Sequence, residues 1–177
     1  MSASEEGVSR ATVALQSAYV FAKACHMTKR PCEVKFFNHA IVTAKEYTKI
    51  ADPEKFEDKA QIFNDEEVDG QKGKLEWNCD HKAIDAATKS LLKRPEKNKI
   101  LVVLSDGSPA PCIDCRTSRG GASDLRDAIA TAEKSGIHIH GVGVQYDCTP
   151  FYKNSIKCTT VAEVGDTFAK LFKDLTK

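Results

Sequence analysis

Five side chains close to the expected ends of structural elements offer only oxygen atoms as possible metal ligands. Ser2 and Ser4 stand at the start of a long helical pattern, Asn78 and Asp80 at the start of another, and Asp106 follows an apolar strand. Hydroxyl, amide and carboxylate oxygens suit a hard divalent cation such as Mg²⁺ or Mn²⁺, which keeps several waters and takes few protein ligands. The same residues also fit structural roles, since Ser4 and Asp80 could be helix N-caps and Asp106 part of a turn. The spacing alone leaves both interpretations open.

The helices that would position these residues follow from hydrophobic periodicity. Apolar residues at three- and four-residue steps predict helices from Ser4 to about Thr28 and from about Asp80 to Leu92. A third helix is predicted from Ser123, as its N-cap, to Gly136. A last helix should begin at a capping box formed by Thr160 and Glu163.

Strands are expected in three places, and with the helices they define the fold class. Continuously apolar runs predict buried strands around Ile100–Leu104 and at 137–144, and β-formers on both sides of Asn38 and His39 predict a hairpin. The alternation predicts an α/β fold: a doubly wound, mostly parallel sheet with the hairpin as an antiparallel edge. We expect a single domain over 1–177, with an irregular insertion around 48–77. Ligands of such sheets bind beyond the carboxyl ends of the strands, where Asp106 should lie.

Composition excludes several classes of function. Lys and Arg number 26 against 25 Asp and Glu, a net charge of +1, which gives no electrostatic basis for binding nucleic acid or an anionic membrane. The longest aliphatic run, 100–104, is far too short to span a bilayer, and the first residues do not have the pattern of a signal peptide. We therefore expect a cytoplasmic protein. The sequence contains neither a phosphate-binding loop nor a Gly-x-Ser-x-Gly nucleophile elbow.

The cysteines could form a second kind of site. Cys112 and Cys115 make a C-x₂-C pair, and Cys148 together with Cys79 or Cys158 could complete a four-thiolate zinc site. The chain has seven cysteines and no second C-x₂-C pair. We therefore expect reduced thiols and no structural zinc at Cys112 and Cys115.

The oxygen-bearing residues resemble the metal-ion-dependent adhesion site (MIDAS) of von Willebrand factor A (vWA) domains. That site begins with Asp-x-Ser-x-Ser after the first strand, takes a third ligand from a middle loop and ends with an Asp after the fourth strand. Ser2 and Ser4 match the two serines, and Asp106 matches the late Asp. The middle ligand, usually Thr in the family, would here be Asn78 or Asp80. The leading Asp and its strand would fall before Met1, so we expect the chain as written to be truncated or split.

Within the vWA family, the stretch NCDHKAIDAATKSLLKRPEKNKILVVLSDGSP is most similar to the CobT subunit of cobaltochelatase. The resemblance implies a non-catalytic subunit that binds an AAA+ ATPase through Mg²⁺, with an acidic residue of the partner completing the metal site. The assembly would insert cobalt into a corrin ring during cobalamin biosynthesis. The alternative is a vWA adhesion module that serves another, MoxR-like, AAA+ ATPase. A third alternative is a hydrolytic or zinc enzyme that uses Cys112, Cys115 and Asp106. The sequence does not offer such an enzyme a nucleophile paired with a general base.

Overall fold

The computed structural model describes residues 10–38, 41–47, 56, 79–105, 107–109 and 121–174. Helices and strands alternate along the second half of this part of the chain, as the sequence predicts. The described elements, in chain order, are α1 (Arg10–Met27), β1 (Val34–Phe37), β2 (Ile41–Lys45), α3 (Asp80–Leu92), β3 (Lys99–Ser105), α4 (Gly121–Lys134), β4 (Ile137–Val144), β5 (Ser155–Cys158) and α5 (Val161–Asp174).

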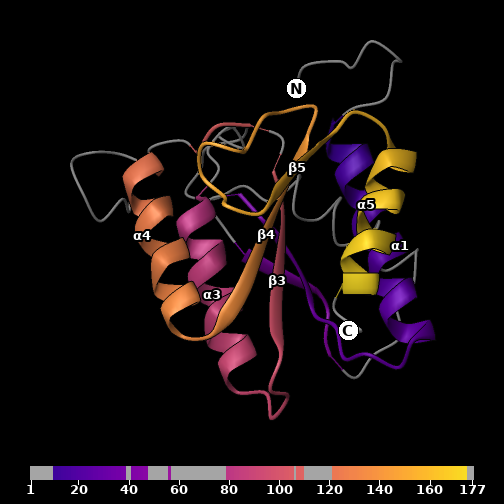
Figure 1. The fold of residues 1–177 in the computed structure, drawn as a ribbon, viewed down its shortest axis with the longest axis horizontal. Helices are drawn as coiled ribbons and strands as arrows, with labels where there is room; N and C mark the ends of the chain where they lie inside the picture. The colour runs from indigo at the N-terminus through magenta and orange to yellow at the C-terminus, as the bar shows by residue number, and fades with distance from the viewer. Residues whose placement is uncertain are drawn as a thin grey trace, which may run out of the picture.

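Strands β3, β4 and β5 form a parallel sheet in that spatial order. Ile100 pairs with His138 in the β3–β4 ladder, and Val144 pairs with Cys158 in the β4–β5 ladder. Parallel neighbours need crossover connections, which α4 supplies between β3 and β4. The carboxyl ends of β3 and β4 and the amino-terminal ends of α3 and α4 consequently lie at the same edge, the upper edge in Figure 1.

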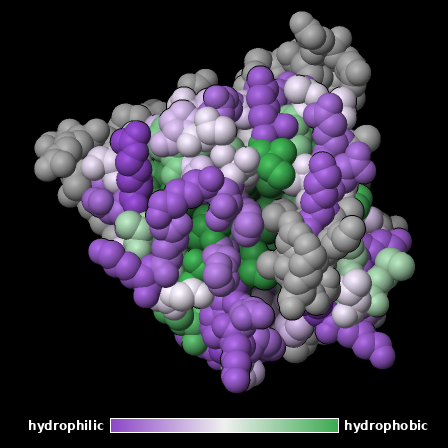
Figure 2. All heavy atoms as spheres, viewed as in Figure 1, coloured by the Kyte–Doolittle hydropathy of each residue, from purple (hydrophilic) through white to green (hydrophobic). Residues whose placement is uncertain are grey.

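Two helical layers cover the two faces of this sheet (Figure 1). Because strand side chains alternate between faces, Ile139 of β4 packs toward α3 and α4, whereas Val142 packs toward α5. Leu125 is buried in the first hydrophobic cluster and Phe168 in the second. Figure 2 shows mostly hydrophilic side chains over the helices, with hydrophobic residues visible mainly in the centre, where β3 and β4 lie.

The predicted hairpin is present, and in the described residues it forms a sheet of its own. Strands β1 and β2 pair antiparallel, with Phe37 opposite Ile41 and an irregularity between Val34 and Lys35. The described ladders join neither strand to β3. Of β3 itself, only Val103 and Ser105 are buried, although its continuously apolar sequence predicted a strand covered on both faces.

The element predictions fare well in the second half of the chain and need three corrections. α4 begins at Gly121, so Ser123 lies inside its first turn and is not its N-cap. The N-cap of α3 is Cys79, so Asp80 is the first helical residue and not a cap. β5 was not predicted. The start of the first helix and the insertion around 48–77 lie outside the described residues, apart from Phe56.

The capping box predicted for α5 is confirmed. The backbone N–H of Glu163 donates to Thr160 Oγ1 at 3.3 Å, and the Glu163 carboxylate accepts the backbone N–H of Thr159 at 2.6 Å. The positive φ of Gly136, 83°, ends α4 where the sequence predicted. None of the helices in the described ranges is long and apolar enough to cross a membrane.

Candidate functional site

Of the five predicted metal ligands, the structure describes Asp80. Ser2, Ser4, Asn78 and Asp106 lie outside the described residues, so their convergence stays a prediction. The site can nevertheless be built from Asp80 and from the residues that surround the edge at which β3 and β4 end.

Asp80 occupies the first position of α3, and its side chain is buried, with the residue 2% exposed. The backbone N–H of Cys79 donates to the Asn38 carbonyl at 3.0 Å, which fixes the start of α3 against the end of β1. A carboxylate at this position lies in the favourable field of the helix N-terminus. The backbone therefore places a carboxylate at the edge of the fold where doubly wound proteins bind their ligands.

Tyr152 lies close to Asp80 in the folded structure. It is 3% exposed, and its pKa is raised above the usual tyrosine value by burial and then by the negative charge of Asp80. The Tyr152 hydroxyl makes no hydrogen bond within the described part of the chain. A buried neutral phenol next to a buried carboxylate makes this corner polar, yet the sequence singled out only the carboxylate.

The turn after β3 is ordered by hydrogen bonds on both sides of the Asp106 position. Ser105 is buried, and its Oγ donates to the Gly107 carbonyl at 3.0 Å. The Ser108 hydroxyl lies 3.0 Å from the Tyr146 hydroxyl, within hydrogen-bond distance. The turn after β3 is thereby connected to the loop after β4.

That loop folds back over the end of β4, and two glycines make room for it. A Cβ atom at Gly141 would lie 2.6 Å from the Tyr152 ring, and one at Gly143 would lie 1.9 Å from the backbone oxygen of Tyr146. Gln145 has a φ of 53°, a left-handed conformation that helps to reverse the chain. The Gly-x-Gly pair of β4 thus gives space for the loop that brings Tyr152 to Asp80, a role that the sequence did not reveal.

A second buried carboxylate, Asp124, was missed by the sequence analysis. It lies in the first turn of α4 and is 3% exposed. The signal available in the sequence was an acidic residue near a helix start, which ordinarily indicates only a favourable interaction with the helix dipole. Its burial distinguishes it from such surface residues.

No group of three or more His, Cys, Asp or Glu side chains that could hold a metal occurs among the described residues. Cys148 and Cys158 are buried free thiols, and Cys79 is buried as well. Burial is the main cause that raises the pKa of Cys148. Cys112 and Cys115 lie outside the described residues, so the expectation of no structural zinc there stays a prediction.

Two comparisons with known proteins bear on this arrangement. The family model described as "Cobalamin biosynthesis protein CobT VWA domain" matches residues 68–176, more than half of the chain. A similar solved structure is the crystal structure of the pilus adhesin SpaC from Lactobacillus rhamnosus GG, with a TM-score of 0.63 and 12% sequence identity. That match covers 96% of this chain and 28% of the adhesin. At this identity the adhesin supports the fold alone.

Proposed function

The chain belongs to the CobT VWA-domain family, and on this premise we propose that it is a metal-dependent protein-interaction subunit that is not itself catalytic. The family description connects the domain with cobalamin biosynthesis. We infer that the assembly it serves is an ATP-dependent cobaltochelatase, which inserts cobalt into a corrin ring. Cobalt is then the cargo, and a partner AAA+ ATPase subunit hydrolyses the ATP.

The residues that would hold the cation are Ser2, Ser4, Asp106 and either Asn78 or Asp80. The described member of this set fits a hard cation, because Asp80 presents a buried carboxylate at the start of α3, beside the end of β1. Bound Mg²⁺ or Mn²⁺ would supply an electropositive position for an acidic side chain of the partner.

The chain's own residues contribute placement and stiffness. The hydrogen bond from Cys79 to Asn38 holds the first turn of α3, and burial restricts the Asp80 side chain. The contact between Ser108 and Tyr146 connects the turn that carries position 106 to the loop after β4. A site whose supports are already packed loses little conformational entropy when a partner binds.

The observation that carries the proposal is the family match over 68–176, which includes both Asp80 and Asp106. The test is a pull-down of the chelatase ATPase subunit with and without Mg²⁺, using wild type, Asp80→Asn and Asp106→Ala. Asp166→Asn is a matched control, because Asp166 is an exposed carboxylate on α5.

Binding should require Mg²⁺ in wild type and in Asp166→Asn. It should weaken by about tenfold or more in Asp106→Ala, because removing a ligand costs at least as much as removing its outer-shell support. Asp80→Asn should show the same loss where Asp80 is the middle ligand and wild-type binding where Asn78 is. Undiminished, Mg²⁺-independent binding by Asp106→Ala would contradict the metal-dependent mechanism. Mg²⁺-dependent capture of a MoxR-like ATPase in place of the chelatase subunit would leave the adhesion site intact and overturn the cobalt assignment.

A further inference from the structure

Two cysteines meet in a hydrophobic cluster that the proposed metal site does not use. Cys25 lies in the last turn of α1, and Cys32 lies two residues before β1. Lys29 has a φ of 55°, and the Arg30 N–H donates to the Cys25 carbonyl at 2.8 Å, so the chain reverses at the end of α1. The two cysteines are buried in the same hydrophobic cluster with Ala22 and Phe56, and the interaction between their thiols shifts the pKa of each.

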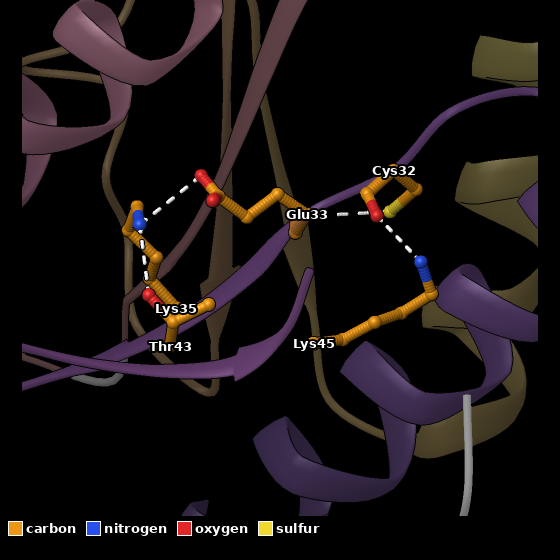
Figure 3. A network of polar contacts seen from close by, with 5 residues as sticks. All are labelled: Cys32, Glu33, Lys35, Thr43 and Lys45. Atoms are coloured by element: carbon orange, nitrogen blue, oxygen red, sulfur yellow. Dashed lines mark hydrogen bonds and ion pairs between the residues drawn. The ribbon is translucent and has the colours of Figure 1, made fainter. Parts of the chain in front are cut away.

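A buried lysine lies against Cys32 of this pair (Figure 3). Lys45, in β2, is 5% exposed, and its Nζ donates to the Cys32 carbonyl at 2.6 Å and to the Glu46 carbonyl at 3.0 Å. Carbonyl oxygens solvate an ammonium group but do not neutralise it. A buried charge is costly unless an opposite charge lies close to it.

The carboxylate of Glu33, the residue after Cys32, is engaged by another lysine. Glu33 pairs with Lys35 at 3.1 Å, and the same Lys35 ammonium donates to Thr43 Oγ1 at 3.0 Å. Figure 3 shows the Glu33 side chain extending toward Lys35 and away from Lys45. No carboxylate within the described ranges comes within ion-pair distance of Lys45. Within the described part of the chain, the Lys45 charge acts on both thiols, and these can become anionic.

The surroundings favour ionisation of Cys32 over Cys25. The interaction with the Cys25 thiol is the main cause that lowers the pKa of Cys32, and Lys45 acts in the same direction against burial and Glu33. The interaction with Cys32, together with burial, raises the pKa of Cys25, although the charges of Lys45 and Arg30 act to lower it. Cys32 Sγ also lies 3.7 Å from the Glu33 carbonyl, but S–H is a weak donor and this contact opposes ionisation only slightly. A thiolate beside a protonated thiol is the arrangement of a nucleophile and its resolving partner.

We propose that Cys25 and Cys32 form a redox-active dithiol, in which a hydroperoxide oxidises Cys32 and Cys25 then closes a disulfide. The Cys32 thiolate attacks one peroxide oxygen, the O–O bond breaks, and the departing hydroxide takes a proton to become water. Cys32 is then a sulfenic acid. Cys25 loses its proton and attacks the Cys32 sulfur, the S–O bond breaks, and a second water leaves. Two thiols lose two electrons in total, and hydrogen peroxide gains them.

The experiment treats the full chain with hydrogen peroxide, blocks the remaining thiols with a maleimide under denaturing conditions, and digests with trypsin. Cleavage after Lys23, Lys29 and Lys35 separates the two cysteines into peptides 24–29 and 30–35. Only a disulfide can then keep these peptides together in the mass spectrum. We expect this linked pair to form first. Cys148 and Cys158 are also buried but lie in other clusters, away from this pair, and should be recovered as maleimide adducts.

Two sets of variants separate the proposed chemistry from simple proximity. Lys45→Met should slow formation of the linked pair, because loss of the ammonium charge disfavours the Cys32 thiolate, which is the reacting form. Lys45→Arg should restore most of the rate. Lys99→Met is the matched control, because Lys99 also donates to a backbone carbonyl, that of Glu96, but is not among the charges that act on either thiol.

Cys25→Ser removes the resolving thiol, so Cys32 should stop at the sulfenic acid and react with a dimedone-type probe. Circular dichroism confirms that each variant is folded. Oxidation of Cys148 or Cys158 as fast as the pair would overturn the proposal, and so would a rate in Lys45→Met equal to that of wild type. Probe labelling of Cys25 in a Cys32→Ser variant at the wild-type rate would reverse the assigned roles and refute the part played by Lys45.

Discussion

The glycine at position 143 should be replaceable by no other residue without a large loss of stability. In Gly143→Ala, the new Cβ would lie 1.9 Å from the Tyr146 carbonyl oxygen, whereas real Cβ atoms essentially never approach another heavy atom within 3.0 Å. The obstacle is backbone, which cannot rotate away, so the loop after β4 must retreat by roughly 1 Å. We expect a cost of about 3 kcal/mol, the upper end of the range for overpacking. For a chain of this length that is a decrease in Tm of roughly 6–12 °C.

Gly165→Ala is the matched control, since it makes the same chemical change inside α5, where no described atom outside the helix's own backbone lies within 4 Å of the new methyl. It should raise stability by up to about 1 kcal/mol, because alanine is the better helix former. Thermal and urea unfolding followed by circular dichroism measure both changes. If the two substitutions shift Tm in the same direction, the backbone oxygen of Tyr146 does not lie as close to Gly143 as the structure places it. The same loop carries the Tyr146 hydroxyl to Ser108, so Gly143→Ala should also weaken Mg²⁺-dependent partner binding.

Three further predictions concern α5 and can be measured by the same unfolding experiments. Phe168→Ala should cost about 3–5 kcal/mol, since Phe168 is 3% exposed and its ring centroid lies 4.6 Å from that of Phe21; a cost below that of a surface substitution would contradict the packing. Thr160→Ala should cost about 1 kcal/mol by removing the N-cap acceptor, and Thr160→Ser should recover most of it. Hydrogen bonds from the backbone N–H and then from the hydroxyl of Thr159 lower the pKa of Glu163. The stabilisation that the Glu163 carboxylate gives to the folded state is therefore fully present above the unfolded-state pKa of about 4.3, and it is lost as the pH falls through the lower folded-state pKa. Glu163→Gln should therefore weaken the dependence of the free energy of unfolding on pH at acid pH. An unchanged pH dependence would show that the capping box does not depend on the charge of Glu163.

The elements that local sequence determines were predictable. α3 could be bounded at Asp80 and Leu92 because its apolar period is regular and Pro95 follows it, and β4 because its apolar run ends in polar residues. β5 escaped prediction, since Ser155–Cys158 is a four-residue strand whose formation depends on pairing with β4. Strands of this kind are stabilised by their neighbours and carry little signal of their own.

In the candidate site, too, some residues could be predicted from the sequence and others could not. Asp80 could be proposed as a ligand because an acidic residue at a helix start next to a sheet edge is visible in the sequence. Tyr152 could not, because it reaches Asp80 only through the return of the chain over Gly141. The pairing of Cys25 with Cys32 likewise depends on the left-handed turn at Lys29, which no glycine or asparagine announces.

The packing of α1 against α5 has a consequence for the protein as it leaves the ribosome. The cluster between the sheet and the α3–α4 layer is built from residues close in sequence, whereas the contact between Phe21 and Phe168 closes over roughly 150 positions. At about 5–20 residues per second, Phe168 is synthesised roughly 7–30 s after Phe21. In the last part of that interval, after β4 has been made, one face of the nascent sheet can be covered while the other still presents Val102 and Val142 to the solvent. We expect a chaperone that binds this chain during translation to recognise that late-closing face.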